Sequence, residues 1–230
     1  MSKNLKIIIQ ARTKSSRIPG KVLRKVKGVS LLEYTIMRIE SANPGTPLIV
    51  CTSDLDCDIP IFELCVRLGV ECFRGSHLNV ASRYFEISYN TQFDAFVRIC
   101  ADSPMVDGHL VRKIIEAWSD KLDILTNKSP RTFPKGQSIE IVNRETYIQS
   151  YQFFEGDDDF EHVTYYFHRN LDHFRYENIR NTEDHSKISL AIDEPKDLVR
   201  FESFVKQYGP HWVELTFDKI LELYPYDRND

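Results

Sequence analysis

Short runs of apolar residues alternate along the chain with longer stretches in which apolar residues recur every three or four positions. The short runs are rich in Ile, Val and Phe and are bounded by polar or turn residues, which is typical of buried strands. The predicted strands are Leu5–Ile9, Leu48–Thr52, Val70–Phe73, Ala95–Cys100, Asp123–Leu125, Ile139–Val142, Arg175–Ile179 and Ile188–Ile192. The helical spacing predicts helices at Leu31–Ala42, Ile61–Leu68, Val80–Tyr89, Gly108–Trp118, Glu145–Phe153, Glu161–Arg169, Lys196–Tyr208 and Phe217–Leu223.

Strands that alternate with helices of about ten residues imply βαβ units, and we predict a three-layer α/β fold. Its mostly parallel, twisted sheet would carry helices on both faces. The alternation is regular to about residue 127, whereas residues 128–187 are less regular and include an acidic loop near 155–159. We therefore interpret 1–230 as a single domain with 128–187 as an inserted lobe, and expect the chain to rejoin the main sheet at 188–193.

Composition narrows the class of protein. The chain has 230 residues, of which 42% are hydrophobic and 28% charged, and this balance excludes a disordered chain or a coiled coil. Because no apolar run approaches the roughly 20 residues of a membrane helix and the N-terminus lacks a signal peptide, we expect a cytoplasmic protein with no membrane partner.

Charge is distributed unevenly along the chain. The net charge of −4 argues against a general nucleic-acid binder, yet residues 1–32 hold nine Lys or Arg and no Asp or Glu. A basic cluster on an acidic body predicts one local site for a compact anion.

The first predicted strand runs directly into a basic loop at residues 10–21. Four cations, Arg12, Lys14, Arg17 and Lys21, fall within ten residues. Arg and Lys are the usual partners of phosphate oxygens, and ligands of open parallel sheets bind beyond the carboxyl ends of the strands. The loop matches neither the Walker A nor the G-x-G-x-x-G pattern.

Two acidic residues follow later strands. Asp102 comes just after Ala95–Cys100, and Asp193 just after Ile188–Ile192, each with a proline two residues further on. Each residue alone could simply cap the next helix. Converging at one crevice beside the basic loop, they would instead bind Mg²⁺, which takes one or two carboxylates together with phosphate oxygens.

These motifs carry a family resemblance. They read Gln-Ala-Arg-x-x-Ser-x-Arg-x-Pro-Gly-Lys at 10–21, Arg-x-x-x-Asp-Ser-Pro at 98–104 and Asp-x-Pro-x-Asp at 193–197. The chain resembles the SpsF-type branch of the cytidylyltransferases, related to the CMP-sialate and CMP-3-deoxy-manno-octulosonate synthetases. Weaker motifs in the same order are Arg74-Gly75-Ser76, Arg83-Tyr84, Pro134-x-Gly136, Glu140, Glu161-His162-Val163-Thr164 and Asp184-His185-Ser186.

The resemblance implies a nucleotide-diphospho-sugar transferase fold, CTP as co-substrate, Mg²⁺ as cofactor and release of pyrophosphate. It implies catalytic roles for Arg12, Lys21 and Asp102 and metal binding by Asp102 and Asp193. The implied nucleotide-binding residues are Gln10, Ala11, Arg12, Ser15, Arg17, Lys21, Arg74, Gly75, Arg83 and Asp102. The implied acceptor-binding residues are Glu140, Glu161, His162 and His185. Arg131 is added because it is a cation in the segment leading to Glu140 and could hold a carboxylate or phosphate of the acceptor. The acceptor would be a sugar acid or phosphorylated metabolite used in surface polysaccharide biosynthesis.

Four positions depart from the family pattern, namely Lys14, Asn79, Ser82 and Ser138. They point to a different substrate or to reduced activity. Two alternatives therefore stay open: another nucleotide-sugar pyrophosphorylase or a glycosyltransferase of the same fold, and a non-catalytic nucleotide-binding homologue. The aromatic residues between 147 and 167 form either core or, as we predict, a homodimer face.

Overall fold

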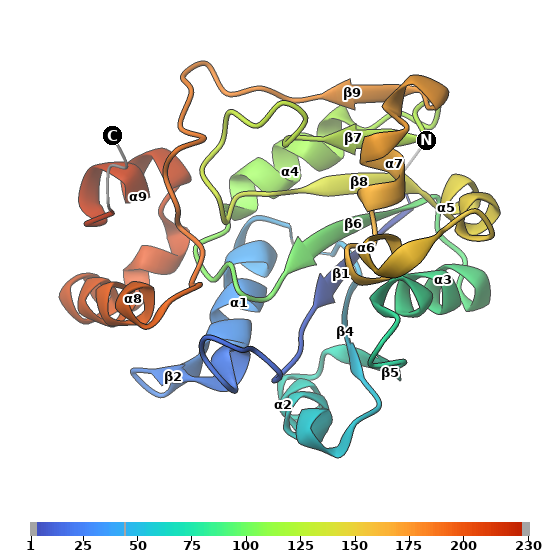
Figure 1. The fold of residues 1–230 in the computed structure, drawn as a ribbon. Helices are drawn as coiled ribbons and strands as arrows, with labels where there is room; N and C mark the ends of the chain where they lie inside the picture. The colour runs from blue at the N-terminus through green and yellow to red at the C-terminus, as the bar shows by residue number, and fades with distance from the viewer. Residues whose placement is uncertain (1–3, 44, 227–230) are drawn as a thin grey trace.

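The computed structural model describes residues 4–43 and 45–226, and a seven-stranded sheet forms its centre (Figure 1). In order across the sheet, the strands are β5 (Glu71–Gly75), β4 (Leu48–Ser53), β1 (Leu5–Gln10), β6 (Ala95–Cys100), β8 (Glu140–Asn143), β7 (Ile124–Thr126) and β9 (Tyr176–Asn178). Only β8 runs antiparallel to its neighbours in this sheet. The predicted three-layer fold with a mostly parallel sheet is thus confirmed.

Helices cover both faces of the sheet because its strands are apolar on both sides. Ile7 and Ile9 of β1 face one layer, and Ile8 between them faces the other. The first layer holds α1 (Leu31–Ala42), α2 (Ile59–Leu68) and α4 (Gly108–Ala117). The second holds α3 (Val80–Asn90), α5 (Arg144–Tyr151), α6 (Gly156–Glu161) and α7 (Tyr165–Arg169), which lie together on the right of Figure 1.

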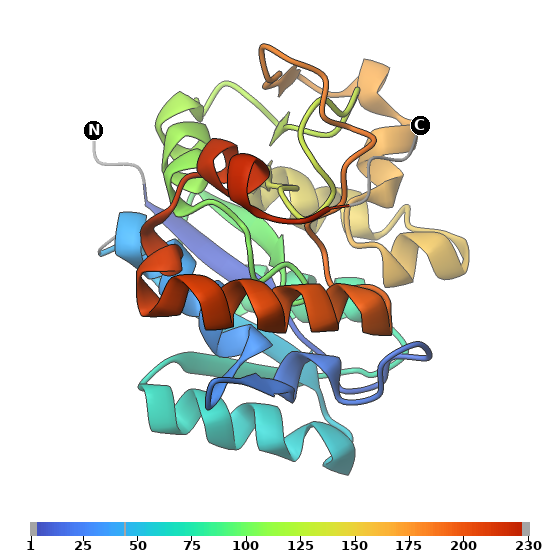
Figure 2. The same ribbon diagram turned by 90° about the vertical axis from the view of Figure 1, so that its left-hand side faces the viewer.

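A third apolar cluster extends the molecule beyond α1. The helices α8 (Pro195–Tyr208) and α9 (Phe217–Leu223) pack with the short hairpin of β2 (Lys25–Val26) and β3 (Val29–Ser30). In Figure 2, α8 and α9 are the red and orange helices that lie in front of the rest of the molecule as an outer layer. No helix in residues 4–43 and 45–226 is long and apolar enough to cross a membrane.

The prediction of a strand at 188–192 was wrong. This segment, here named the strap, makes a single bridge between Ser189 and Lys135 and lies outside the sheet. Its buried residues Leu190 and Ile192 pack in the α8–α9 cluster. The apolar run therefore signalled burial correctly but not β pairing, because a short apolar run does not specify its partner.

The prediction of one helix over 161–169 was also wrong. The chain forms two short helices, α6 and α7, separated by His162–Thr164, and the buried Val163 adopts φ 53°. The residues expected in an acidic loop, 157–159, form the first turn of α6, where acidic side chains complement the helix dipole.

Two strands of the segment 128–187, β8 and β9, belong to the main sheet, and α5–α7 pack on one of its faces. Most aromatic residues of this segment lie in that core, including Tyr147, Phe154 and Phe167. Phe153 and Tyr165 are exposed. The division into a domain and an inserted lobe stays a prediction, as does the homodimer.

Candidate functional site

The basic loop begins where β1 ends and is held in a defined shape by a buried carboxylate. Asp58 accepts hydrogen bonds from the backbone N of Thr13 at 2.7 Å and from its Oγ1 at 2.5 Å. Burial alone would raise the pKa of Asp58, but the bonds from Ser53 and Thr13 outweigh it and lower the pKa. Gly20, with φ 68°, closes the loop through its backbone N–H to the carbonyl of Thr13 at 2.9 Å.

Lys21 brings the two predicted metal-binding carboxylates together. Its Nζ lies 3.2 Å from Asp102 Oδ2 and 3.6 Å from Asp193 Oδ1, and it donates a hydrogen bond to the carbonyl of Ile192 at 2.8 Å. The strap places Asp193 there, since the backbone N of Ile192 donates to the carbonyl of Asp102 at 3.0 Å. Two carboxylates that are 91 positions apart in the sequence thus share one ammonium group.

Two further cations contact Asp193. Its carboxylate lies 3.5 Å from Arg17 Nη2 and 2.5 Å from Lys135 Nζ. Burial would raise the pKa of Asp193, but Lys135, then Lys21 and Arg17, outweigh that effect and lower it. Asp193 therefore stays ionised at neutral pH and concentrates three cations at one point.

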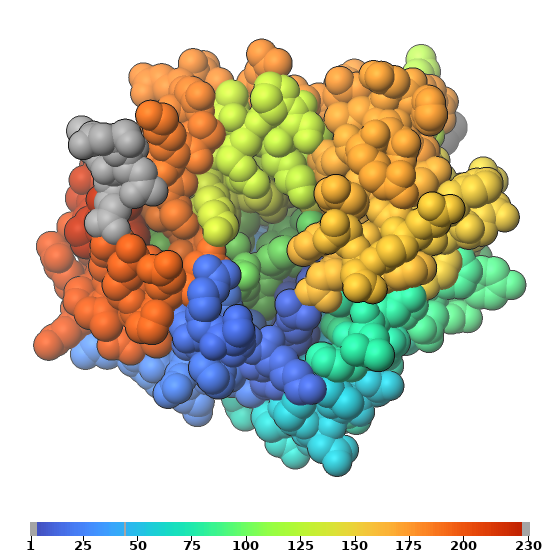
Figure 3. Space-filling view, in the orientation of Figure 1, coloured from blue at the N-terminus to red at the C-terminus, as the bar shows by residue number. Residues whose placement is uncertain are grey.

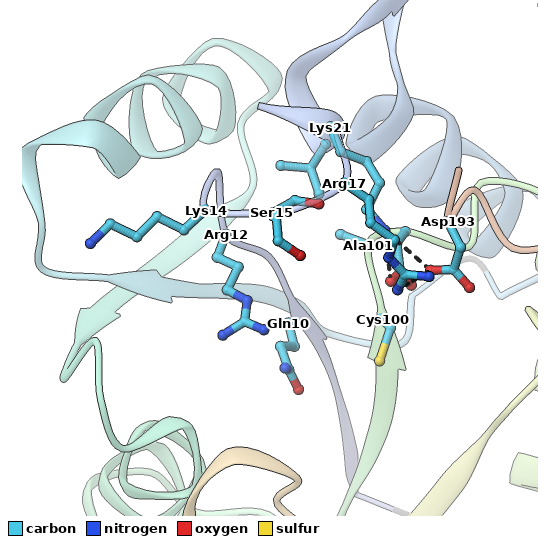
Figure 4. Close-up of a pocket in the computed structure, with 12 residues that line it drawn as sticks. Gln10, Arg12, Lys14, Ser15, Arg17, Lys21, Cys100, Ala101 and Asp193 are labelled. Atoms are coloured by element: carbon cyan, nitrogen blue, oxygen red, sulfur yellow. Dashed lines mark hydrogen bonds and ion pairs between the residues drawn. The ribbon is translucent and has the colours of Figure 1, made fainter. Parts of the chain in front are cut away.

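Most of the residues predicted to bind nucleotide or metal line one cavity of about 210 Å³. They are Gln10, Arg12, Ser15, Arg17, Lys21, Asp102 and Asp193. Figure 4 shows Arg17 and Lys21 directed towards Asp193, with Lys14 pointing away from this cluster. Figure 3 shows the hollow between the blue N-terminal loop, the lime segment near residue 130 and the gold segment near residue 160. This convergence is what the motifs predicted; the role of each residue stays a prediction.

The other predicted nucleotide-binding residues lie in supporting positions. Ala11 is buried under the loop, and its N–H donates to the carbonyl of Cys51 at 3.0 Å. Arg74 donates to the carbonyls of residues 53–55, and the buried Arg83 donates to the carbonyl of Ser76 at 2.8 Å. Gly75 packs closely against Arg83, so a Cβ there would lie 3.2 Å from its Cγ. These residues shape the loops beside the cavity without lining it.

The donor set near Lys21 fits a hard divalent cation. Asp102 and Asp193 supply carboxylate oxygens, which Mg²⁺ prefers. In the described ranges 4–43 and 45–226 no group of three His, Cys, Asp or Glu side chains could hold a metal ion. A cation bound here would therefore complete its shell with phosphate oxygens and water.

Glu140 is the centre of a second buried network. It accepts from Arg98 Nη1 at 2.6 Å and from Thr164 Oγ1 at 3.1 Å, and Lys128 Nζ lies 3.3 Å away. Burial would raise the pKa of Glu140, but Lys128, then His168 and Arg98, bring it well below the ordinary value. Glu140 is thus a permanent anion compensated by several donors.

His168 is a residue of this network that the sequence did not single out. Its Nε2 is hydrogen bonded to Glu140, and its Nδ1 lies 2.8 Å from Ser129 Oγ. Because the ionised Glu140 can only accept, Nε2 carries a proton and donates it to this bond, while Nδ1 forms the hydrogen bond with the hydroxyl of Ser129. Both partners lie at least 28 positions away, so no local sequence signal marked this histidine.

Arg98, Lys128, Ser129, His162, Tyr165 and His168 line a cavity of about 340 Å³ next to the first. Arg98 connects the two, since its Nη2 donates to Gln10 Oε1 at 3.3 Å. Of the predicted acceptor residues, His162 lines this cavity and Glu140 lies beneath it.

The remaining predicted acceptor residues are placed differently. Glu161 forms an ion pair with Arg12 at 2.6 Å, so it bridges to the nucleotide side. Arg131 is half-buried near Glu140, and burial lowers its pKa. His185 lies 3.5 Å from Glu183 and does not line the cavity that His162 lines.

Comparisons with known proteins show what the chain as a whole is similar to. A family model described as cytidylyltransferase matches residues 6–224. An uncharacterised protein of Methanocaldococcus jannaschii is 30% identical over 87% of this chain and 83% of its own. The spore coat polysaccharide biosynthesis protein SpsF of Bacillus subtilis is 28% identical over 88% of this chain and 86% of its own. The structure of a cytidylyltransferase from Leptospira borgpetersenii superposes with a TM-score of 0.90 at 25% identity, covering 96% of this chain and 93% of that one.

Proposed function

The chain belongs to the cytidylyltransferase family, and on that premise we propose that it transfers the cytidylyl group of CTP to a small acidic acceptor and releases pyrophosphate. The observation that carries this proposal is the position of Lys21 between Asp102 and Asp193 beside the basic loop. Opposite charges held at one point fit a ligand that brings phosphates together with a divalent cation.

The chain's own residues would bind and orient the triphosphate. Arg12, Arg17 and Lys21 line the cavity and offer donors to phosphate oxygens. Asp102 and Asp193 would hold Mg²⁺, which neutralises phosphate charge when bound. An oxygen of the acceptor then attacks the α-phosphorus in line, and the pyrophosphate that leaves carries charge that these cations stabilise.

The second cavity would receive the acceptor. Arg98 and Lys128 outnumber the single carboxylate of Glu140, so the cavity favours an acidic ligand. Gln10 and Arg98 join the two cavities, which would place the acceptor next to the nucleotide. We propose a sugar acid or phosphorylated metabolite, and a role in surface polysaccharide synthesis is supported by what the SpsF relative is named for.

A pyrophosphate-release assay tests this function. The protein is incubated with Mg²⁺, each of CTP, UTP, GTP and ATP, and a panel of sugar acids and phosphorylated metabolites. We expect that, of the four nucleotides, only CTP releases pyrophosphate in the presence of an acceptor. Release with UTP and not with CTP would identify a different nucleotidyltransferase. Thermal unfolding with the same nucleotides tests binding, because a ligand at 100 times its Kd stabilises by about 2.7 kcal/mol. Failure of every nucleotide to stabilise the protein would contradict the proposal.

The proposal includes the cytoplasm as the place of reaction and a homodimer as the active form. The exposed Phe153 and Tyr165 are the residues of the predicted face that remain available for a partner copy. Sedimentation equilibrium is expected to give twice the chain mass of 26.9 kDa, and a monomer mass at all concentrations would refute the dimer.

A further inference from the structure

A groove of about 270 Å³ adjoins the triphosphate cavity and shares Arg17 and Asp193 with it. Its far side is formed by the strap, the residues just before it and the first turn of α8. The groove is several times larger than the roughly 30 Å³ that one water occupies in the liquid. The two cavities meet at Arg17 and Asp193, so a small anion held by the groove would lie next to the triphosphate cavity.

The charges in the groove leave an excess of cations. Two of its acidic groups have basic partners, since Lys196 lies 3.2 Å from Glu194 and Arg200 lies 3.9 Å from Asp197. The other charged residues that line the groove are three cations, Arg17, Lys135 and Lys187, and one anion, Asp193. The side chains of Arg17 and Lys135 are 58% and 57% exposed, so both can turn towards a ligand in the groove.

The fold places Lys135 there through a close contact of two segments. Its N–H donates to the carbonyl of Ile188 at 2.8 Å, and its carbonyl accepts from Leu190 at 2.7 Å. The next residue, Gly136, has φ 94°, and a Cβ there would lie 2.7 Å from the backbone N of Ala191. Only glycine lets the two segments approach this closely, and their contact fixes Lys135 beside Asp193.

The lining indicates which anion fits. Among the described residues that line the groove there is no aromatic ring on which a nucleobase could stack. Cations with flexible stems and serine hydroxyls instead suit a compact, highly charged anion. We propose that the groove binds a diphosphate, and that its occupant is the pyrophosphate leaving the reaction. This inference rests on the proposed function.

Arg17, Lys135 and Lys187 would bind pyrophosphate one after another as it leaves. Arg17 contacts both cavities and would be the first to pass it on, while Lys187 lines only the groove. Lys135 is bound to Asp193 in this structure and becomes available once Asp193 has another partner. The path gives the product a way out that does not cross the acceptor cavity.

Lys187→Gln tests the proposal because Lys187 does not line the triphosphate cavity. Lys113→Gln, on the exposed side of α4, is the matched control for loss of one positive charge. Pyrophosphate binding is measured by calorimetry, without catalysis, and product inhibition by pyrophosphate is measured in the release assay. Lys187→Gln is expected to weaken binding and inhibition about twofold to fivefold, and the double variant with Lys135→Gln further.

The outcomes separate this inference from the proposed function. If Lys187→Gln binds pyrophosphate as tightly as the wild type and Lys113→Gln, the groove is not its site. If Lys187→Gln raises the KM of the acceptor and leaves pyrophosphate inhibition unchanged, the groove holds an acceptor phosphate and the inference is wrong. Weakened pyrophosphate binding in a protein that releases none from any nucleotide would support the groove and refute the proposed function.

Discussion

Replacement of Asp193 by Asn is the most informative perturbation of the site. The substitution keeps the size of the side chain and removes the charge that holds Arg17, Lys21 and Lys135 together. It also removes one of the two carboxylates proposed to bind Mg²⁺. Stability and catalysis should therefore respond to very different extents.

The effect on stability should be modest. Lys21 keeps its contacts with Asp102 and with the carbonyl of Ile192, so no buried charge is left without a partner. Arg17 and Lys135 are more than half exposed, and such ion pairs contribute about 0 to 1 kcal/mol each. We expect the free energy of unfolding to fall by about 1 to 2 kcal/mol in total.

The effect on catalysis should be much larger. Loss of one electrostatic contact to the reacting phosphates costs about a hundredfold or more in rate, close to 2.7 kcal/mol of barrier. Pyrophosphate release at saturating CTP measures it, and urea unfolding of the same preparation measures stability. Asp120→Asn, in an exposed turn before β7, is the charge-matched control and should leave both unchanged. Release by Asp193→Asn within about threefold of the wild type would refute the role assigned to this carboxylate.

Other predictions test the framework around the site. Glu140→Gln leaves the buried guanidinium of Arg98 without its anion and should destabilise the fold by about 3 to 5 kcal/mol in urea unfolding; a loss below about 1 kcal/mol would contradict this. Hydrogen bonds from Arg175 outweigh burial and lower the pKa of Asp123 from 3.8 to about 2. Ionised Asp123 should thus add about 1 to 2 kcal/mol to the free energy of unfolding above pH 3.8, and this contribution should disappear as the pH falls towards 2. The free energies of unfolding of the wild type and Asp123→Asn should therefore converge over this range, and a constant difference between them would refute the reasoning. Gly136→Ala should lower the midpoint of thermal unfolding, since its φ of 94° and the backbone 2.7 Å from the added Cβ leave no room; an unchanged midpoint would show that the strap can shift.

The sheet could be predicted from the sequence because its signals are local. The nearly continuous run of apolar, buried residues along β1, β4 and β6 is a property of neighbouring residues, and so is the position at which each strand ends. The capping box of Ser30 and Glu33 is a similar local signal, and it opens α1. The cavity at the strand ends followed from topology, since parallel strands place their carboxyl ends at one edge.

The second cavity could not be predicted in the same way. A glutamate on an apolar strand such as Glu140 requires cationic or hydrogen-bonding partners, and that much can be expected from burial. Its partner His168 could not be identified, because the break of the helix at Val163 sets the direction in which α7 presents its side chains. That break is stabilised by Thr164, whose Oγ1 donates to the same carboxylate, so site and backbone depend on each other.

The cations between β7 and β8 show the limit most clearly. Lys128 and Lys135 are seven positions apart in one loop, and the sequence offers no reason to separate their roles. In the structure Lys128 compensates Glu140, whereas Lys135 compensates Asp193 in the other cavity. The difference arises where residues 134–137 cross the strap, a contact between segments more than 50 positions apart. The local sequence thus predicts that this loop places two lysines near the site. The contact between residues 134–137 and the strap determines that they pair with different carboxylates.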